Sequence, residues 1–219
     1  MENNKIEMRT VIKKNPILAI MRNIPLEDTV DYIDMAVRGG VPFFEVALNS
    51  EDALEQIAML REKRGEKCLI GAGTAITVEK AESAIRAGAQ FLLTPGTPED
   101  VLEYCAARSI PLLPGVMTPY DVAVCLKYGF RTMKLFPAGS MPAGYVRNLK
   151  GPYDDTEYVA IGGVTQNNIS SFFEDGYLGV GLSSALVPQN IVKEKRWEEG
   201  VAIIRMLEKK VRSIRRETR

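Results

Sequence analysis

The chain has 219 residues, 46% of them hydrophobic and 26% charged, a composition typical of a globular protein. Its 28 basic and 28 acidic residues balance, so the net charge favours neither a nucleic-acid nor a membrane partner. The chain has no histidine, which removes the commonest general base and the imidazole ligands that catalytic zinc sites generally use.

The chain begins with MENNKIEMRTVIKKN, which has no apolar core and does not have the pattern of a secretory signal. Residues 2–14 predict a helix ahead of the first strand. No uninterrupted apolar run approaches the roughly 18–20 residues that a membrane-spanning helix needs. We expect a cytoplasmic protein with no membrane partner.

Short apolar runs alternate with amphipathic stretches along the rest of the chain. The stretches predict helices, several of which begin with Ser or Thr before acidic residues and end in Gly. Strands joined through helices at this spacing pair in parallel by right-handed crossovers. The eight runs that predict strands are residues 16–22, 43–48, 68–73, 91–95, 110–115, 132–137, 157–163 and 178–184.

Eight such units in about 200 residues predict a closed (β/α)8 barrel, the TIM-barrel fold. We expect residues 1–219 to form this single domain, with the extra helix at 2–14 at the barrel bottom. An open doubly wound sheet is the alternative, but no strand opens a G-x-G-x-x-G turn into a helix. The last helix is predicted at 193–216, and its basic end is interpreted as a solvated helix terminus.

Side chains alternate along a strand, so the sequence predicts which of them face the barrel axis. In FFEVALN (43–49) one face is wholly apolar and should meet the helices, which turns Glu45 inward. In TMKLF (132–136) the same alternation turns Lys134 inward. The second and sixth strands lie opposite one another in an eight-stranded barrel, so Glu45 and Lys134 should face each other across the axis.

A lysine in an apolar strand requires a reason, because lysine is rarely fully buried without a partner. One interpretation is a buried Glu45–Lys134 ion pair with no chemistry, although such a pair recovers little more than its desolvation cost. The other interpretation is a catalytic amine, because burial lowers the pKa of a lysine and frees its nitrogen as a nucleophile.

Several strand ends carry residues suited to binding anions. IGGV (161–164) and GVGLSS (179–184) end the seventh and eighth strands, where barrels of this kind commonly bind phosphate, although tight turns alone would also explain the glycines. Thr74 ends the third strand and offers its hydroxyl to a carboxylate. Arg22 ends the first strand and is a bidentate anion ligand by its chemistry.

The cysteines indicate neither a disulfide framework nor a C-x-x-C metal site, because Cys68, Cys105 and Cys125 are widely separated. We interpret them as buried thiols that take part in packing. With no histidine either, we expect no metal site.

The motifs AIMR, FEVALNS, IGAGT, LTPG, PGVMTP, MKLFPA, AIGGV and GVGLSSALV resemble the KDPG/KHG aldolase family, from about Pro16 to Pro188. That family cleaves 2-keto-3-deoxy-6-phosphosugar acids into pyruvate and glyceraldehyde 3-phosphate. The resemblance implies a homotrimer of (β/α)8 barrels that uses a Schiff-base lysine and needs neither a metal nor another cofactor. The expected partner is a small 2-keto acid phosphate, and no nucleic acid.

The resemblance also implies roles for individual residues. Lys134 would form the Schiff base, and Glu45 would transfer protons. The residues implied to bind the substrate are Thr74 at the pyruvyl carboxylate with Arg22 near the same end, Pro95 and Phe136 in the pocket wall, and Gly162, Gly163, Gly181, Ser183 and Ser184 at the distal phosphate.

One position departs from the pattern of many phosphogluconate aldolases, which have arginine four residues after the catalytic glutamate. This chain has Asn49 there, and its L-N-S ending resembles the branch that acts on 2-keto-3-deoxy-6-phosphogalactonate. The configuration of the substrate at C4 is therefore open.

Three other functions also stay open at this point. One is a 4-hydroxy-2-oxoglutarate aldolase, and another is a different phosphosugar-binding TIM-barrel enzyme, which would not need the inward lysine. The third is a catalytically silent barrel in which Glu45 and Lys134 only pair.

Overall fold

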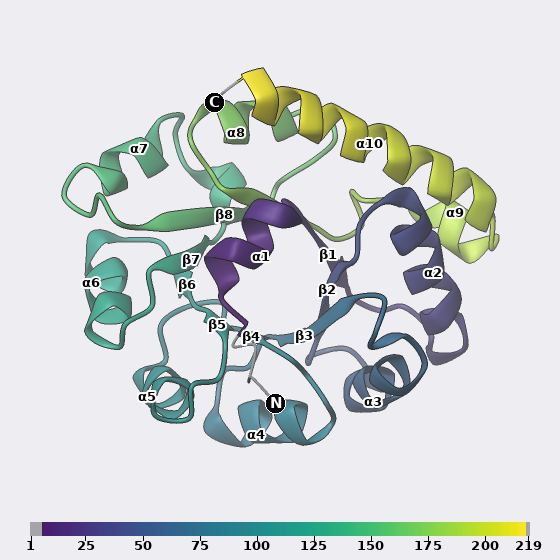
Figure 1. Ribbon diagram of the computed structural model, residues 1–219, viewed down its shortest axis with the longest axis horizontal. Helices are drawn as coiled ribbons and strands as arrows, with labels where there is room; N and C mark the ends of the chain where they lie inside the picture. Colours follow the sequence, from purple (N-terminus) through teal and green to yellow (C-terminus); the bar gives the residue numbers. More distant parts are fainter. Residues whose placement is uncertain (1–5, 218–219) are drawn as a thin grey trace.

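The computed structural model describes residues 6–217. In this range a nine-stranded parallel sheet curls into a barrel inside a ring of helices (Figure 1). The sheet order is β5-β4-β3-β2-β1-β9-β8-β7-β6. The strands are β1 (Ile17–Met21), β2 (Phe43–Ala47), β3 (Leu69–Gly73), β4 (Leu92–Leu93), β5 (Leu112–Leu113), β6 (Gly115–Val116), β7 (Thr132–Leu135), β8 (Glu157–Ile161) and β9 (Gly179–Leu182).

The fifth predicted strand forms two short strands because Pro114 interrupts it. β5 pairs with β4, and β6 pairs with β7. Proline has no N–H to donate to a sheet, but the Pro114 carbonyl accepts a hydrogen bond from Lys134 N at 2.8 Å. The two ends of the sheet order are thus consecutive in the chain, which closes the barrel and confirms the predicted (β/α)8 fold.

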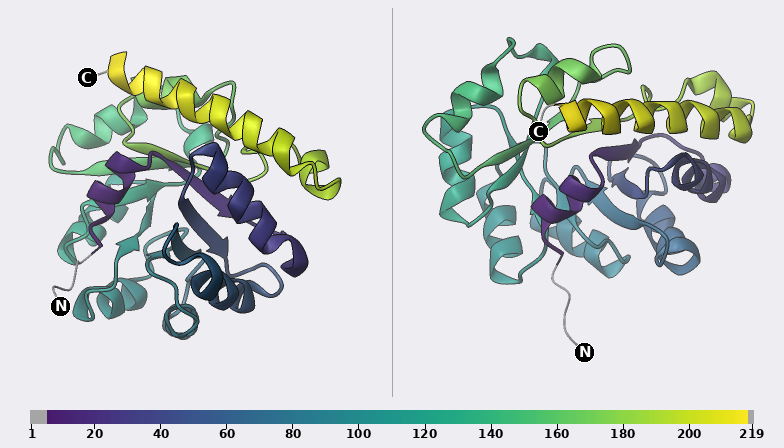
Figure 2. Two further views of the ribbon diagram at one scale, coloured as in Figure 1. Left: turned by 45° about the vertical axis from the view of Figure 1, so that its right-hand side comes forward. Right: turned by 45° about the horizontal axis from the view of Figure 1, so that its top comes forward.

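Helices connect the strands and cover the outside of the barrel (Figures 1 and 2). Before α4, Thr77 Oγ1 accepts a hydrogen bond from Lys80 N, and Thr118 and Asp121 cap α6 reciprocally. Gly40 ends α2 with a φ of 101°, a conformation that favours glycine. The helices are α1 (Met8–Lys14), α2 (Thr29–Gly39), α3 (Ala53–Arg64), α4 (Val78–Arg86), α5 (Glu99–Ala107), α6 (Pro119–Lys127), α7 (Tyr145–Lys150), α8 (Ile169–Glu174), α9 (Gln189–Lys193) and α10 (Trp197–Glu217), with 3-10 turns η1 (Leu26–Asp28) and η2 (Ala138–Ser140).

Apolar side chains fill both faces of the sheet. Phe44 and Leu135 lie in the layer between the sheet and the helices. Phe43 and Phe91 lie inside the barrel, with ring centroids 5.0 Å apart. Gly71 leaves room for this pair, since a Cβ there would lie 2.4 Å from the Phe91 ring. The strands therefore alternate between the two layers as the sequence predicts.

Helix α1 closes the bottom of the barrel, and Figures 1 and 2 show it lying across that end. Met8 and Ile12 pack against the apolar side chains inside the barrel. The helix predicted at 2–14 thus has its predicted place but begins at Met8, and residues 1–5 lie outside the described part of the chain. Glu7 caps the helix, because its carboxylate accepts hydrogen bonds from the N–H groups of the next turn.

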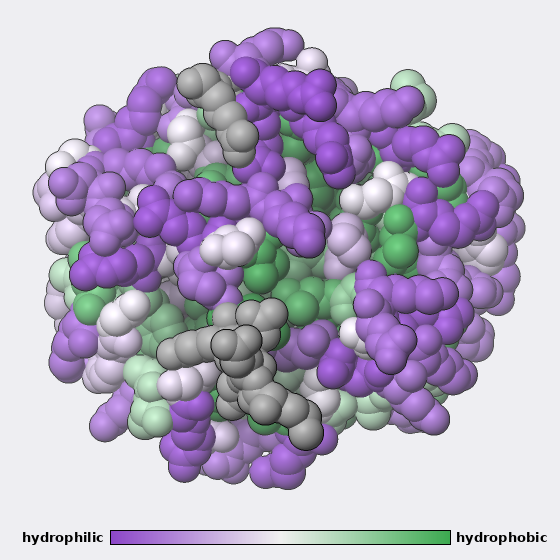
Figure 3. Space-filling view, viewed as in Figure 1, coloured by the Kyte–Doolittle hydropathy of each residue, from purple (hydrophilic) through white to green (hydrophobic). Residues whose placement is uncertain are grey.

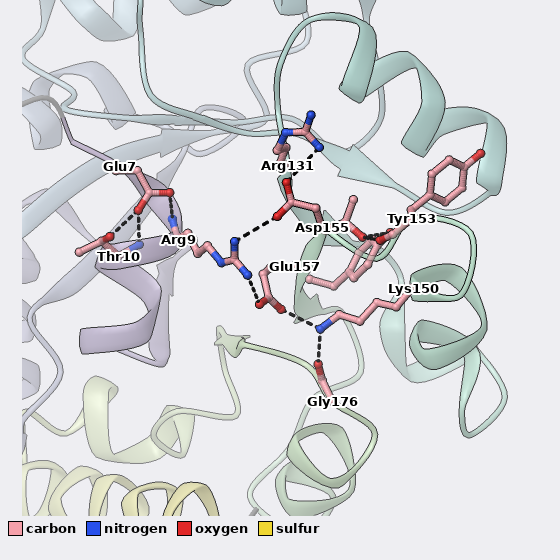
Figure 4. A network of polar contacts seen from close by, with 11 residues as sticks. Glu7, Arg9, Thr10, Arg131, Lys150, Tyr153, Asp155, Glu157 and Gly176 are labelled. Carbon is pink, nitrogen blue, oxygen red and sulfur yellow. Dashed lines mark hydrogen bonds and ion pairs between the residues drawn. The ribbon is translucent and has the colours of Figure 1, made fainter. Parts of the chain in front are cut away.

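An ionic network ties α1 to β8 (Figure 4). Arg9 and Lys150 donate hydrogen bonds to the Glu157 carboxylate at 2.9 and 2.7 Å. Asp155 pairs with Arg9 at 3.4 Å and with Arg131 at 3.3 Å. Burial by itself raises the pKa of Glu157, but the hydrogen bonds from Lys150 and Arg9 outweigh it and hold that pKa below its ordinary value.

The helix predicted at 193–216 is wrong at its start. The chain forms the short helix α9, breaks, and starts again as α10. Lys195 lies in the break with a φ of 52°, and its Nζ pairs with Asp28 at 2.6 Å. Beyond the break α10 packs along α2, where a Cβ on Gly39 would lie 2.5 Å from Ile204. The apolar spacing along α10 identifies its buried face correctly but cannot reveal the break before it.

Hydrophilic residues dominate the face of the molecule seen in Figure 3, with hydrophobic residues showing mainly toward its middle. Among the residues that the structure describes, no helix is both long and apolar enough to cross a membrane.

We predict that Glu157→Gln lowers the free energy of unfolding by about 1–3 kcal/mol at pH 7, because two cations lose their charged acceptor. The folded-state pKa of Glu157 is lowered, so its carboxylate stabilises the fold above the unfolded pKa and loses this effect as the pH falls through the folded pKa. The difference between variant and wild type should therefore shrink below about pH 4. Urea unfolding at a series of pH values measures it.

The matched control is Glu103→Gln, which changes an exposed carboxylate on α5 and should leave unfolding unaltered. Equal stability of Glu157→Gln and wild type at pH 7 would contradict the proposed contribution of the network.

Candidate active site

Glu45 on β2 and Lys134 on β7 lie inside the barrel, as the alternation of both strands predicts. Only 1% of Glu45 and 5% of Lys134 is exposed. Their strand neighbours Phe44 and Leu135 belong to the helix-side layer. The adjacent strand β3 makes room for the carboxylate, since a Cβ on Gly73 would lie 1.6 Å from Glu45 Oε1. Any side chain at position 73 would displace the Glu45 carboxylate.

The two buried groups do not make a contact ion pair. Within residues 6–217 no hydrogen bond or ion pair joins Glu45 to Lys134, and Glu45 Oε2 is buried without a hydrogen-bond partner. The Nζ of Lys134 lies 5.1 Å from the centroid of the Phe136 ring. A purely structural pair would be expected to satisfy its charges by direct contact, and this pair does not.

Burial dominates the electrostatics of both groups. Burial raises the pKa of Glu45, while the positive charges of Lys134 and Arg22 oppose this rise. Burial lowers the pKa of Lys134, which Glu45 opposes and Arg22 reinforces. The two pKa values move toward each other, which favours the neutral amine of Lys134 and the protonated form of Glu45 more than in exposed side chains.

Thr74 and Asn49 lie next to each other at the rim, where β3 and β2 end. Thr74 Oγ1 is 3.4 Å from Asn49 Oδ1, a long hydrogen bond that leaves both groups available to a ligand. Thr74 has a φ of 62°, which is rare for a β-branched residue and occurs mainly where function requires it. Pro95 and Phe136 line the same end of the barrel as partly exposed apolar residues.

The glycines after β8 are required by the turn itself. Gly162 and Gly163 have φ values of 86° and 77°. The Gly162 carbonyl accepts a hydrogen bond from Gly139 N at 2.8 Å, and a Cβ on Gly163 would lie 3.0 Å from Gly139 Cα. Gly181 lies within β9, where a Cβ would lie 2.8 Å from Ile161. These positions fit the predicted anion site, but their backbone geometry explains the glycines without one.

A cavity of about 400 Å³ opens at the ends of β1 and β9. Its lining includes Arg22, Ser183 and Ser184. Arg22 influences the pKa values of both Glu45 and Lys134, so the cavity adjoins the buried pair. The cavity thus brings Arg22 together with the two serines, and the expected place of Arg22 near Thr74 at the acid end of the substrate stays a prediction.

The same cavity is lined by Tyr32 and Lys193, which sequence reasoning did not single out. Tyr32 falls on the apolar stripe of the amphipathic stretch 26–40, where the sequence predicts an ordinary core residue. Lys193 is the first residue of the predicted last helix, where a lysine is expected to be exposed to solvent. Only the fold brings the two segments together.

The family described as KDPG and KHG aldolase matches residues 8–203 of this chain. The 2-dehydro-3-deoxy-6-phosphogalactonate aldolase of Escherichia coli (strain K12) is 28% identical over 193 residues, 88% of this chain and 94% of that protein. The 2-dehydro-3-deoxy-phosphogluconate aldolase of Treponema pallidum (strain Nichols) is 32% identical over 158 residues, 72% of this chain and 73% of that protein. Among solved structures, the KDPG aldolase of Legionella pneumophila, with pyruvate captured as a covalent carbinolamine, matches with a TM-score of 0.85 at 26% identity, over 93% of this chain and 98% of that one.

We predict that cyanate, a small reagent that reacts with neutral amines, carbamylates Lys134 along a pH profile whose midpoint lies below the ordinary lysine value of about 10.4. Glu45→Gln should move this midpoint lower still, because it removes the negative charge that favours the ammonium. Arg22→Met should move it higher, because it removes a repelling positive charge. Peptide mass spectrometry after short exposures at a series of pH values gives each midpoint.

The exposed Lys209 on α10 provides an internal reference in the same digest. A Lys134 midpoint equal to that of Lys209, or an upward shift in Glu45→Gln, would contradict the electrostatics described above.

Proposed function

The chain belongs to the KDPG and KHG aldolase family and is therefore an aldolase, a lyase, and we propose that it cleaves a 2-keto-3-deoxy-6-phosphosugar acid through a Schiff base on Lys134. The products would be pyruvate and glyceraldehyde 3-phosphate. The observation that carries the proposal is the burial of Lys134 opposite Glu45 without a hydrogen bond or ion pair between them. The carbinolamine in the Legionella relative supports it by analogy.

Lys134 would act as the nucleophile. Its neutral amine attacks the C2 ketone of the substrate, and the resulting carbinolamine loses water to give a positively charged iminium. Burial favours this step, because it lowers the pKa of Lys134 and so raises the fraction of free amine. The iminium then serves as the electron sink for cleavage.

Glu45 would carry the protons. As a carboxylate it removes the C4 hydroxyl proton, directly or through a water, while the C3–C4 bond breaks and its electron pair flows into the iminium. The aldehyde leaves, and the enamine on Lys134 is protonated at C3. Hydrolysis of the iminium then releases pyruvate and restores the amine. A raised pKa suits Glu45 to both directions of transfer.

The substrate would extend from Lys134 toward the cavity. The Thr74 hydroxyl would hold the pyruvyl carboxylate at the rim of β3, with Pro95 and Phe136 against the carbon chain. Arg22 lies close enough to act on the buried pair and also lines the cavity with Ser183 and Ser184. The distal phosphate would accordingly bind there.

The remaining substrate-binding residues of this proposal belong to the Gly-rich strand ends. Backbone amides in the turn at Gly162 and Gly163 would face the phosphate, and Gly181 would allow β9 to approach closely. We also propose, from the family resemblance, that a single barrel domain assembles into a cytoplasmic homotrimer.

We predict that Glu45→Gln retains imine formation with pyruvate but loses about 10²–10⁴-fold in kcat for cleavage, because the proton carrier is gone while the amine remains. Coupled-enzyme detection of released pyruvate gives kcat, and intact mass after borohydride reduction reports the imine. A variant that cleaves within a few-fold of wild type would show that another group transfers the proton.

The choice of C4 epimer should depend on Asn49, which lies beside Thr74 at the rim. Its neutral amide can hydrogen-bond a substrate hydroxyl, and a mismatched epimer would leave buried polar groups unpaired. We predict that the phosphogalactonate epimer is cleaved at least as well as the phosphogluconate epimer, and that Asn49→Arg shifts the ratio toward phosphogluconate.

The measurement is kcat/KM for the two purified epimers with wild type and Asn49→Arg. A wild-type preference of more than about tenfold for the phosphogluconate epimer, unmoved by the substitution, would exclude Asn49 as the residue that reads this hydroxyl.

A further inference from the structure

Arg22 is not the only charged residue that lines the cavity at the ends of β1 and β9. Lys193 and Asp28 line it too, and Asp28 is paired with Lys195. The cavity wall is completed by α9, which places Lys193 at the cavity, and by the first turns of α2, which place Tyr32 there. Neither residue has a part in the chemistry at Lys134. Both lie on helices outside the sheet, Tyr32 on α2 and Lys193 on α9, and not at the ends of the strands.

Lys193 is an uncommitted cation. It is exposed, and in the described part of the chain its ammonium makes no ion pair or hydrogen bond. Lys195, two residues further on, is in contrast neutralised by Asp28 at 2.6 Å. The pairing of Lys195 anchors the break after α9 to η1, which fixes the segment carrying Lys193 next to the cavity. Of the two lysines, only Lys193 is left with its charge available to a ligand.

Tyr32 brings to the cavity a hydroxyl that has no hydrogen-bond partner within the described part of the protein and that is not fully buried. Only 3% of Tyr32 is exposed, and within residues 6–217 its hydroxyl has no hydrogen-bond partner. Burial raises its pKa, so it stays a neutral O–H donor. The hydroxyl lines the cavity and can therefore donate a hydrogen bond to an anion bound there without giving up a bond within the described part of the protein.

We propose that Lys193 and Tyr32 are specificity-determining residues that bind the phosphate monoester end of the substrate, together with Arg22 and the two serines. The inference rests on the proposed function. A phosphate monoester carries about −1.5 to −2 charges at pH 7 and three acceptor oxygens. Arg22 and Lys193 supply two positive charges, and Tyr32, Ser183 and Ser184 supply hydroxyl donors. A substrate that ended in a carboxylate or a hydroxyl would leave part of this set unused.

The test compares a phosphorylated 2-keto-3-deoxy acid with its unphosphorylated counterpart. Lys193→Met should lower kcat/KM for the phosphorylated acid about tenfold, mostly through KM, and leave the unphosphorylated acid unchanged. Tyr32→Phe should lower kcat/KM for the phosphorylated acid about fivefold, yet leave the melting temperature of the free protein unchanged, because the removed hydroxyl makes no hydrogen bond within the described part of the protein. Lys209→Met on α10 is the charge-matched control and should leave kcat/KM unchanged for both acids.

A second readout does not depend on turnover. Titration of wild type and both variants with inorganic phosphate, followed by ³¹P NMR, should show binding weakened by similar factors in Lys193→Met and Tyr32→Phe, and unchanged in Lys209→Met. This titration decides the inference even if wild type cleaves no 2-keto acid, an outcome that would instead overturn the proposed function.

Three results would overturn the inference. The first is Lys193→Met matching wild type with both substrates and in the phosphate titration. The second is an equal loss with phosphorylated and unphosphorylated acids, which would make Lys193 a structural residue. The third is a clear drop in the melting temperature of Tyr32→Phe without any change in phosphate binding, which would make the hydroxyl a packing group.

Discussion

The site depends on the burial of two ionisable groups, Lys134 and Glu45, that face each other inside the barrel without touching. Each is poorly solvated there, and neither is compensated by a contact ion pair. Desolvation therefore sets their properties, and it shifts the two pKa values in opposite directions. A closed barrel is well suited to this, because its inward side chains come from different strands and are held at fixed separations.

Other parts of the structure cover the barrel interior at one end and leave it accessible at the other. Helix α1 seals the bottom with Met8 and Ile12, and the Glu157 network holds the helix in place. Gly73 leaves the space that the Glu45 carboxylate occupies. At the open end lies the cavity lined by Arg22, where in the proposed mechanism a charged substrate would bind. The contacts that stabilise the fold at α1 and the proposed binding cavity thus lie at opposite ends of the barrel.

The sequence was sufficient to predict which side chains of a strand face the barrel axis, because side chains alternate with a period of two residues. Alternation alone turns Glu45 and Lys134 inward, and the structure confirms both orientations. Pro114 was a sequence signal that the fifth strand is interrupted, but alternation could not show that its two parts pair with different neighbours. Nor could it bring Lys193 and Tyr32 to one cavity, because the path of the connecting segments decides which of their side chains meet. Strand periodicity predicts the barrel interior, and tertiary packing determines the composition of the rim.

The most direct measurement of the central claim is the site of covalent capture. Protein incubated with pyruvate and reduced with borohydride should carry one pyruvyl group, and peptide mapping should place it on Lys134 alone among the lysines of the chain. The label should be absent from Lys134→Met. A pyruvyl group on a different lysine, or no label with folded wild-type protein, would contradict the assignment of Lys134 as the reactive amine.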